Sequence, residues 1–268
     1  MNFHIVSQTP EGDLLDYIKE TYRLSFKDEK KDQYRIVIDD GCYDFVFFKE
    51  GDSLLKYGNN LIAPIKEKVF TIHQLTPPYQ LNFGNQLTFF TAKVQPWWNR
   101  SFFENKEEKG IIDLFDNYGQ EIIELHKNLF KTQDFNSQND LFKNFIENHK
   151  PIYTEDIHLV KKVCFDIYKH KGNISVNELS EKFLMNRQEL NTTFKKEVLY
   201  TLKKFITIVR VIEAIRFKIK NPELRLTDLA LQSGYFDQAH FNNDFKRACG
   251  TSPSKLFKNL PEFLYRHQ

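Results

Sequence analysis

The 268-residue chain is 41% hydrophobic and 15% aromatic, which excludes a wholly disordered protein and allows two domains with a core each. No segment is apolar over the length of a membrane span, and the N-terminus lacks a signal peptide's basic stretch and apolar core, so we expect a cytoplasmic protein without a membrane partner.

The net charge is +2, but residues 1–150 hold 18 Lys and Arg against 23 Asp and Glu, and residues 151–268 hold 20 against 13. The resulting charges of −5 and +7 indicate a basic second domain that meets a polyanion, with a merely solvated lysine-rich surface as the alternative.

The first domain is predicted to consist mainly of β-strands. Segments rich in β-branched and aromatic residues lie at 34–38, 43–48, 69–72 and 87–92. The Gly, Asn and Asp residues that tight turns need gather at 39–41, 50–52, 57–60 and 82–85. Short strands with such turns favour an antiparallel barrel or sandwich.

Beyond Pro96 the hydrophobic period changes to that of helices. Apolar residues recur at helical spacing from Ile111 to Phe130 and again from Leu141 to Ile146, which predicts two helices joined by the polar residues 133–139. These helices either cover the barrel or pair with a second subunit. Pro151 is predicted to separate a first domain, 1–150, from a second, 151–268.

The chain offers little for catalysis. His73 is the only histidine within residues 34–94, and Cys42, Cys164 and Cys249 are too scattered to form a Cys-x-x-Cys pair. No nucleophile elbow, glycine-rich phosphate loop or clear acid–base carboxylate pair occurs. We therefore expect buried thiols, no metal, no cofactor and no enzymatic activity.

Several aromatic side chains of the first domain are candidates for a pocket that holds an apolar effector. The same residues also suit an ordinary core, so both interpretations stay open. The candidates are Tyr43, Tyr57, Tyr79, Trp97 and Trp98.

A helical pattern occurs twice in the second domain. In the first copy, Ser175 and Glu178 fit a capping box, and Asn186 suits the start of the next helix. Leu190 and Phe194, four residues apart on that helix, predict its buried face. A helix followed by a second, capped helix is typical of a helix-turn-helix.

The second copy follows a helix predicted over 202–220, which spans roughly 27 Å and so holds the two copies at a distance comparable to one DNA turn. Gly234 permits the positive φ of a tight turn, and Asp237 suits the cap of the next helix. Phe241 and Phe245 repeat the buried spacing of the first copy.

The second copy includes Gly234-Tyr235 and ends with Gly250-Thr251-Ser252-Pro253. With these motifs, residues from about 157 to 260 resemble the double helix-turn-helix DNA-binding domain of AraC-type transcription regulators. Residues 40–47 and 74–78 resemble the cupin-like sensor domain found ahead of it. The resemblance implies an α+β protein of two domains, in which a cupin-like antiparallel barrel or sandwich with flanking helices precedes an all-α double helix-turn-helix.

The function implied by the resemblance is regulation of transcription through sequence-specific binding in the major groove of double-stranded DNA. Candidate further partners are a small-molecule effector, a second copy of the chain and RNA polymerase. The rival from the enzyme class is a cupin-like enzyme with a helical appendage, which bound metal would support.

The residues expected to contact DNA lie on the polar faces of the two recognition helices. Asn and Gln suit adenine edges, Arg suits guanine, and Lys and Arg suit phosphates. The first helix offers Asn186, Arg187, Gln188, Glu189, Asn191, Thr192, Lys195 and Lys196. The second offers Asp237, Gln238, Ala239, His240, Asn242, Asn243, Lys246 and Arg247.

The first copy departs from the family pattern. Leu199 and Leu202 stand where a glycine and a proline are usual, so the first recognition helix is predicted to run on past Val198 and to be the weaker reader of DNA. Thr192 and Asn243 stand where the family tends to carry arginine. These departures motivate a second rival, an interaction protein whose DNA binding is weakened.

Overall fold

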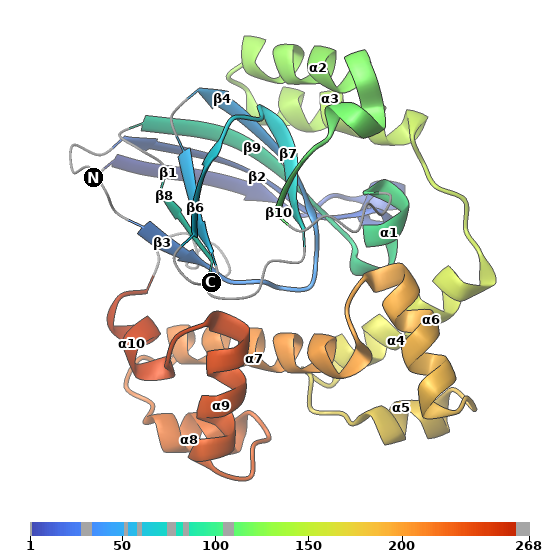
Figure 1. Cartoon of the computed structure of the whole chain (residues 1–268), viewed down its shortest axis with the longest axis vertical. Coiled ribbons are helices and arrows are strands. Elements are labelled where there is room, and N and C mark those ends of the chain that lie inside the picture. Colours follow the sequence, from blue (N-terminus) through green and yellow to red (C-terminus); the bar gives the residue numbers. More distant parts are fainter. Residues whose placement is uncertain are drawn as a thin grey trace. The chain divides into compact units, whose positions relative to one another are not determined.

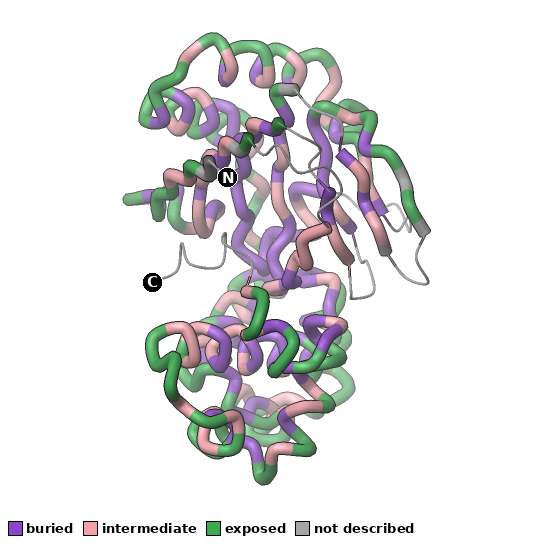
Figure 2. The backbone as a smooth tube through the Cα atoms, turned by 90° about the vertical axis from the view of Figure 1, so that its left-hand side faces the viewer, coloured by how far each residue is buried: buried purple, intermediate pink, exposed green. Residues whose placement is uncertain are grey.

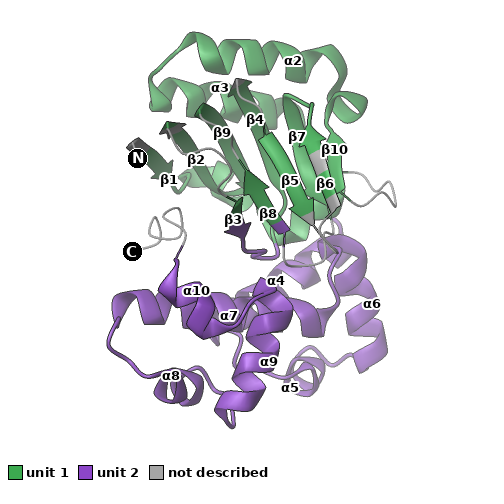
Figure 3. Ribbon diagram, turned by 60° about the vertical axis from the view of Figure 1, so that its left-hand side comes forward, with its two compact units in different colours: residues 1–35, 42–76, 80–152 green, residues 36–41, 77–79, 153–268 purple. Residues whose placement is uncertain are grey.

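The chain divides into two compact units (Figure 3). The computed structural model describes residues 2–27, 34–50, 53–57, 61–73, 79–82, 86–103 and 110–260. The units change between Ile152 and Tyr153, close to the predicted boundary at Pro151. Residues 36–41 and Tyr79 belong to the second unit, although they precede Pro151 in the sequence.

Two antiparallel sheets make up most of the first unit, as the strand pattern predicts. The larger sheet has the order β1-β2-β9-β4-β7-β10 and the smaller has the order β3-β8-β5-β6. The strands are β1 (Asn2–Gln8), β2 (Ile18–Lys27), β3 (Tyr34–Val37), β4 (Asp44–Glu50), β5 (Ser53–Tyr57), β6 (Leu61–Ile65), β7 (Val69–His73), β8 (Tyr79–Asn82), β9 (Gln86–Val94) and β10 (Gly110–Asp113). The helices of this unit are η1 (Gly12–Asp16), η2 (Pro96–Trp98), α1 (Asn99–Phe102), α2 (Phe115–Lys131) and α3 (Phe135–Asn148).

The larger sheet has an aromatic centre. Phe47 of β4 lies opposite Phe90 of β9, and Phe45, two positions before Phe47, points to the same side because side chains alternate along a strand. Helix α3 packs against these rings: the Phe142 ring centroid lies 5.5 Å from that of Phe45 and 5.8 Å from that of Phe90. Figure 1 shows α2 and α3 lying over this sheet, so the helices that close the first unit cover it.

Two sequence predictions about these helices are wrong at their edges. Ile111 and Ile112 are not helical but pair with β7 as strand β10, because strand hydrogen bonding overrides their helical spacing. The joint between α2 and α3 is shorter than residues 133–139. Asp134 already caps α3 by accepting a hydrogen bond from the Ser137 N–H at 2.8 Å.

The second unit is helical in its described part, apart from the ends of β3 and β8. Its helices are α4 (Glu155–Lys169), α5 (Val176–Lys182), α6 (Arg187–Val198), α7 (Leu202–Lys220), α8 (Leu226–Gln232), α9 (Gln238–Cys249) and α10 (Pro253–Lys258). The helix predicted over 202–220 is α7, with the same bounds. Figure 2 shows buried residues recurring along the helices of this unit, which fits packing of one face of each helix. Among the described helices of the whole chain, none is long and apolar enough to cross a membrane.

Candidate nucleic-acid interface

Helices α8 and α9 form the second helix-turn-helix as predicted. Gly234 takes a φ of 77° in the turn, a conformation that suits glycine. Asp237 caps α9, since its carboxylate accepts a hydrogen bond from the His240 N–H at 2.7 Å. Phe241 and Phe245 are fully buried, with ring centroids 5.4 Å apart. The inward face of α9 is thus fixed, and its opposite face is turned to solvent.

Helices α5 and α6 form the first helix-turn-helix in the same way. The predicted capping box is present, since the Ser175 hydroxyl accepts from the Glu178 N–H at 3.2 Å and the Glu178 carboxylate accepts from the Ser175 N–H at 2.8 Å. Asn186 caps α6 by accepting from the Glu189 N–H at 2.8 Å. Leu190 is buried on the inward face of this helix.

The two recognition helices end alike. Leu199 has a φ of 66° and Gly250 a φ of 67°, so both take the left-handed conformation that stops a helix. The Leu199 N–H donates to the Lys195 carbonyl at 3.0 Å, and the Gly250 N–H donates to the Lys246 carbonyl at 2.8 Å. The prediction that the first recognition helix runs on past Val198 is therefore wrong. Its stop is made by a leucine in a backbone conformation that L-residues ordinarily avoid.

The starts of the following helices are also alike. The Thr201 hydroxyl accepts from the Lys204 N–H at 3.2 Å to cap α7, and the Ser252 hydroxyl accepts from the Lys255 N–H at 3.4 Å to cap α10. Leu202 thus begins a new helix, as Pro253 does in the second motif. The first motif thus has the geometry of the second without its glycine and proline.

Most of the candidate DNA-contacting residues are exposed. On the first recognition helix and its cap these are Asn186, Arg187, Gln188, Glu189, Thr192, Lys195 and Lys196. On the second they are Asp237, Ala239, His240, Asn243, Lys246 and Arg247.

Three further candidates are only half-exposed, namely Asn191, Gln238 and Asn242. The Asn191 side-chain oxygen accepts from the Leu202 N–H at 3.0 Å, and that of Gln238 accepts from the Thr227 hydroxyl at 2.8 Å. The Asn242 oxygen is buried with no hydrogen-bond partner in the described part of the chain. The oxygens of Asn191 and Gln238 thus already hold elements of the motifs together.

The basic side chains differ in how they are engaged. The Lys196 ammonium lies 2.7 Å from the Asp156 carboxylate and 3.3 Å from that of Glu197, and these hydrogen bonds raise the pKa of Lys196. The Arg247 guanidinium lies 3.7 Å from the Asp244 carboxylate. For Lys195, the described residues contribute neither an ion pair nor a side-chain hydrogen bond. Lys195 is thus exposed and unneutralised.

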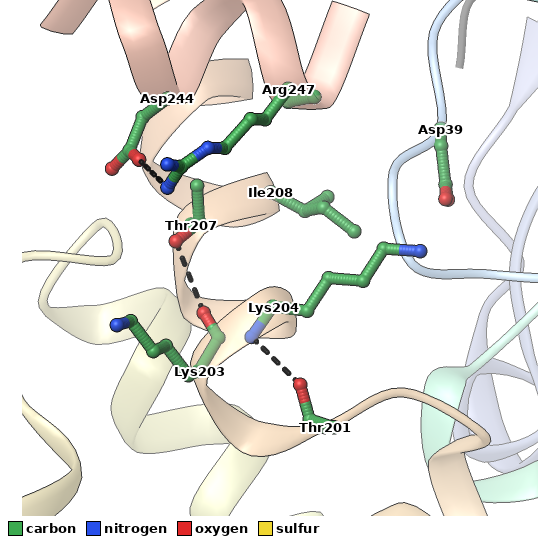
Figure 4. Close-up of a pocket in the computed structure, with 9 residues that line it drawn as sticks. Asp39, Thr201, Lys203, Lys204, Thr207, Ile208, Asp244 and Arg247 are labelled. Carbon is green, nitrogen blue, oxygen red and sulfur yellow. Dashed lines mark hydrogen bonds and ion pairs between the residues drawn. The ribbon is translucent and has the colours of Figure 1, made fainter. Parts of the chain in front are cut away.

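A cavity of about 300 Å³ lies at the start of α7 in the second unit. Lys203, Lys204 and Arg247 give it positive charge, and Asp39 and Asp244 give it negative charge. Figure 4 shows Lys204 extending toward Asp39. Sequence reasoning missed this site because Asp39 is far from α7 along the chain and belongs to no local motif.

The candidate effector residues Tyr43, Trp97 and Trp98 are buried in the first unit. The two indole N–H groups donate to the Asp16 carbonyl, at 3.2 Å from Trp97 and 2.9 Å from Trp98. Tyr43 contacts the buried His73 ring, with centroids 4.7 Å apart. Of the remaining two, Tyr79 is half-buried, and the Tyr57 side chain lies outside the described part. Effector binding by these five residues stays a prediction.

The described residues contain no cluster of three or more His, Cys, Asp or Glu side chains that could hold a metal ion. Cys42, Cys164 and Cys249 are unbridged and buried, as predicted. Burial raises the pKa of the Cys249 thiol, which keeps it protonated and unreactive.

The second part of the chain is similar to known helix-turn-helix proteins. A family of helix-turn-helix domains matches residues 179–259, from within α5 to just past the end of α10. The chain is 28% identical over 104 residues to the Msm operon regulatory protein of Streptococcus mutans, a stretch that covers 39% of this chain and 36% of that protein. It is 33% identical over 91 residues to the XylDLEGF operon transcriptional activator 1 of Pseudomonas putida, covering 33% and 27% respectively. The matched stretch therefore spans only about a third of these relatives.

The fold of the whole chain is similar to that of ToxT from Vibrio cholerae. The TM-score is 0.50 at 14% identity, and the alignment covers 90% of this chain and 98% of that one. At this identity the likeness concerns the fold alone. It agrees with the predicted order of a β-rich unit followed by a helical one.

Proposed function

We propose that this chain, whose C-terminal unit is a helix-turn-helix domain of the AraC type, is a transcription regulator that binds two successive major-groove segments of one DNA site. The observation that carries the proposal is the matched build of the two recognition helices, each capped at its start and stopped by a left-handed residue. Helix α7 joins the two motifs and, with 19 residues, is roughly 27 Å long, which is comparable to one DNA turn of roughly 34 Å.

The charge of the second part of the chain supports the same proposal. Residues 151–268 hold 20 Lys and Arg against 13 Asp and Glu. Lysines near the ends of both recognition helices suit phosphates, and Gln188 and Asn243 expose amides that suit base edges. Helices α6 and α9 end in the same left-handed conformation, at Leu199 and Gly250. The reason for expecting α6 to bind DNA more weakly than α9 therefore no longer holds.

The decisive experiment is selection of duplex fragments from a random DNA pool by the full chain, followed by footprinting. We expect an enriched sequence with two protected major-groove segments about one turn apart. Gln188→Ala should relax the preference at one segment and Asn243→Ala at the other, each at a cost on the order of 1–3 kcal/mol if a base contact is lost. A pool that yields no enriched sequence would favour the rival interpretation as an interaction protein.

We also propose that the first unit provides regulation, through an effector, through pairing of two copies, or both. The resemblance of this unit to a cupin-like sensor domain supports both routes, although Tyr43, Trp97 and Trp98 are buried and α2 and α3 cover the larger sheet. Native mass spectrometry of the purified chain tests both, since it reports the number of copies and any retained small molecule. Metal analysis of the same sample tests the rival enzyme, which requires a stoichiometric ion, and RNA polymerase stays a candidate partner.

A further inference from the structure

A short segment from the N-terminal part of the sequence is built into the DNA-binding unit. Residues 36–41, which comprise the end of β3 and the start of its connection to β4, belong to the second unit. Ile38 is buried in the hydrophobic core of the second helix-turn-helix, the cluster that contains Phe241 and Phe245, and Ile36 packs against the same cluster. The second motif therefore completes its core with side chains from outside residues 151–268.

Asp39, the next residue of this segment, contacts the connection that follows the first recognition helix. The Asp39 carboxylate accepts hydrogen bonds from the Tyr200 hydroxyl, at 3.0 Å and 2.9 Å to its two oxygens, and from the Gly41 N–H at 2.9 Å. Tyr200 lies between Leu199, which stops α6, and Thr201, which caps α7. Asp39 and Tyr200 are both buried, and a carboxylate is buried at acceptable cost only when it is hydrogen-bonded in this way.

Three neighbouring groups favour the charged form of the buried Asp39 carboxyl. Burial raises its pKa, whereas the Gly41 N–H, the Lys204 charge and the Tyr200 hydroxyl lower it. The Lys204 ammonium in turn lies 4.7 Å from the centre of the Tyr200 ring. Asp39, Tyr200 and Lys204 thus form one connected group, and two of its members, Asp39 and Lys204, line the cavity in Figure 4.

The segment also contacts the helix that joins the motifs. Gly41 has a φ of 78°, and a Cβ atom there would lie 2.6 Å from the Phe205 ring of α7. The Phe205 ring in turn contacts the Phe194 ring of α6, with centroids 5.3 Å apart. The segment 36–41 thus contacts three parts of the second unit. These are the connection after α6, helix α7 and the core of the second motif.

We propose that Asp39 is a positioning residue for DNA binding, which together with Ile38 fixes the orientation of the first recognition helix relative to the second. This inference rests on the proposed function. Helix α7 joins the two motifs, and α6 meets α7 through the short connection Leu199–Thr201. The Asp39 carboxylate holds Tyr200, the middle residue of this connection. Two recognition helices fit one DNA face only if that angle is maintained.

The test compares two duplexes bound by the full chain: the selected two-segment site, and the same site with the segment read by α6 scrambled. Asp39→Asn and Tyr200→Phe should each weaken binding to the intact site on the order of tenfold, the loss expected for one hydrogen bond to a charged group. Binding to the half-scrambled site should be unchanged. The double variant should be no worse than either single one, because both remove the same interaction.

Glu223→Gln is the control, since it removes a negative charge from an exposed position of the same unit, and it should bind both duplexes as the wild type does. Thermal unfolding confirms that each variant is folded. Folded Asp39→Asn and Tyr200→Phe variants that bind the intact site normally, or that lose affinity equally for both duplexes, would overturn the positioning role. A wild-type chain that selects no DNA would overturn the proposed function, and this inference with it, before any variant is made.

Discussion

Gly172 lies against the backbone of α7 at Arg210. A Cβ atom on Gly172 would lie 2.5 Å from the Arg210 main-chain nitrogen and 2.7 Å from the Ile206 carbonyl oxygen. The Arg210 side chain closes the contact, since its Nε donates to the Gly172 carbonyl at 2.7 Å. The loop that leads into the first motif is thereby held directly on the joining helix.

We expect Gly172→Ala to lower the free energy of unfolding of the second unit by roughly 3 kcal/mol or more. The methyl group would meet backbone that cannot move aside, and the φ of 72° adds strain. Chemical denaturation measures the loss. Gly234→Ala is the matched control, with a φ of 77°, because the atoms nearest to its Cβ would belong to the exposed side chain of Asn173. Equal losses in the two variants would contradict the backbone contact as the cause.

A second prediction concerns Leu184, in the turn of the first motif. Its φ is 53°, which strains the backbone of a leucine. Because its side chain is 93% exposed, burial of that side chain does not offset the strain. Leu184→Gly should therefore raise the free energy of unfolding, by about 0.5–1 kcal/mol after the greater freedom of glycine in the unfolded chain is counted.

The control for Leu184 is Leu231→Gly, which changes another exposed leucine, this time inside α8. There glycine should cost about 1 kcal/mol, because the backbone is helical. The two substitutions should thus have opposite signs in the same denaturation experiment. Destabilisation by Leu184→Gly would show that this turn is not strained.

The helix caps and the two left-handed leucines, Leu184 and Leu199, show which features the sequence predicts and which it does not. Capping residues such as Ser175, Asn186 and Asp237 act within four residues, so their roles follow from local pattern and are confirmed. Leu184 and Leu199 take the conformations that Gly234 and Gly250 take in the second motif, yet no local rule predicts a left-handed leucine. The surrounding helices impose that geometry, and only a tertiary structure reveals it.

Long-range pairing accounts for the other differences. Ile111 and Ile112 have helical spacing but become a strand because β7 offers unpaired backbone groups. The hydrogen bond from Tyr200 to Asp39 joins residues 161 positions apart, and no periodicity connects them. The candidate DNA-contacting face follows from the spacing of buried residues, whereas the use of Asn191 to hold the start of α7 does not.

A third prediction concerns pH and His126 in the first unit. Burial lowers the pKa of His126, helped by Lys68 and Lys127, although a hydrogen bond to the Phe48 carbonyl at 2.6 Å opposes this. A histidine with a lowered pKa in the folded state disfavours folding once it must be protonated. Its stabilising contribution is therefore complete above the unfolded value of 6.5 and is lost as the pH falls below it.

The free energy of unfolding of the first unit should thus decrease as the pH falls below 6.5, and His126→Gln should make this decrease smaller. Denaturation curves across this range provide the measurement. His4→Gln, at an exposed position of β1, serves as the control and should leave the slope unchanged. A variant at His126 with an unaltered slope would assign the pH dependence to other groups.

The last prediction separates neighbouring lysines on the first recognition helix. Lys195 and Lys246 hold equivalent places, since the carbonyl of each accepts the N–H of the residue that stops its helix. Lys196 is instead paired with Asp156 at 2.7 Å. A lysine that contacts phosphate releases a counterion, so Lys195→Ala and Lys246→Ala should each reduce the slope of log affinity against log salt by about 1. They should weaken all DNA sequences alike. Lys196→Ala should change the slope less, because its ammonium is already neutralised, and Asp156→Asn should increase the slope because it removes the nearer of the two carboxylates that pair with Lys196. A loss at Lys196 equal to that at Lys195, with no effect of Asp156→Asn, would mean that the ion pair does not persist on DNA.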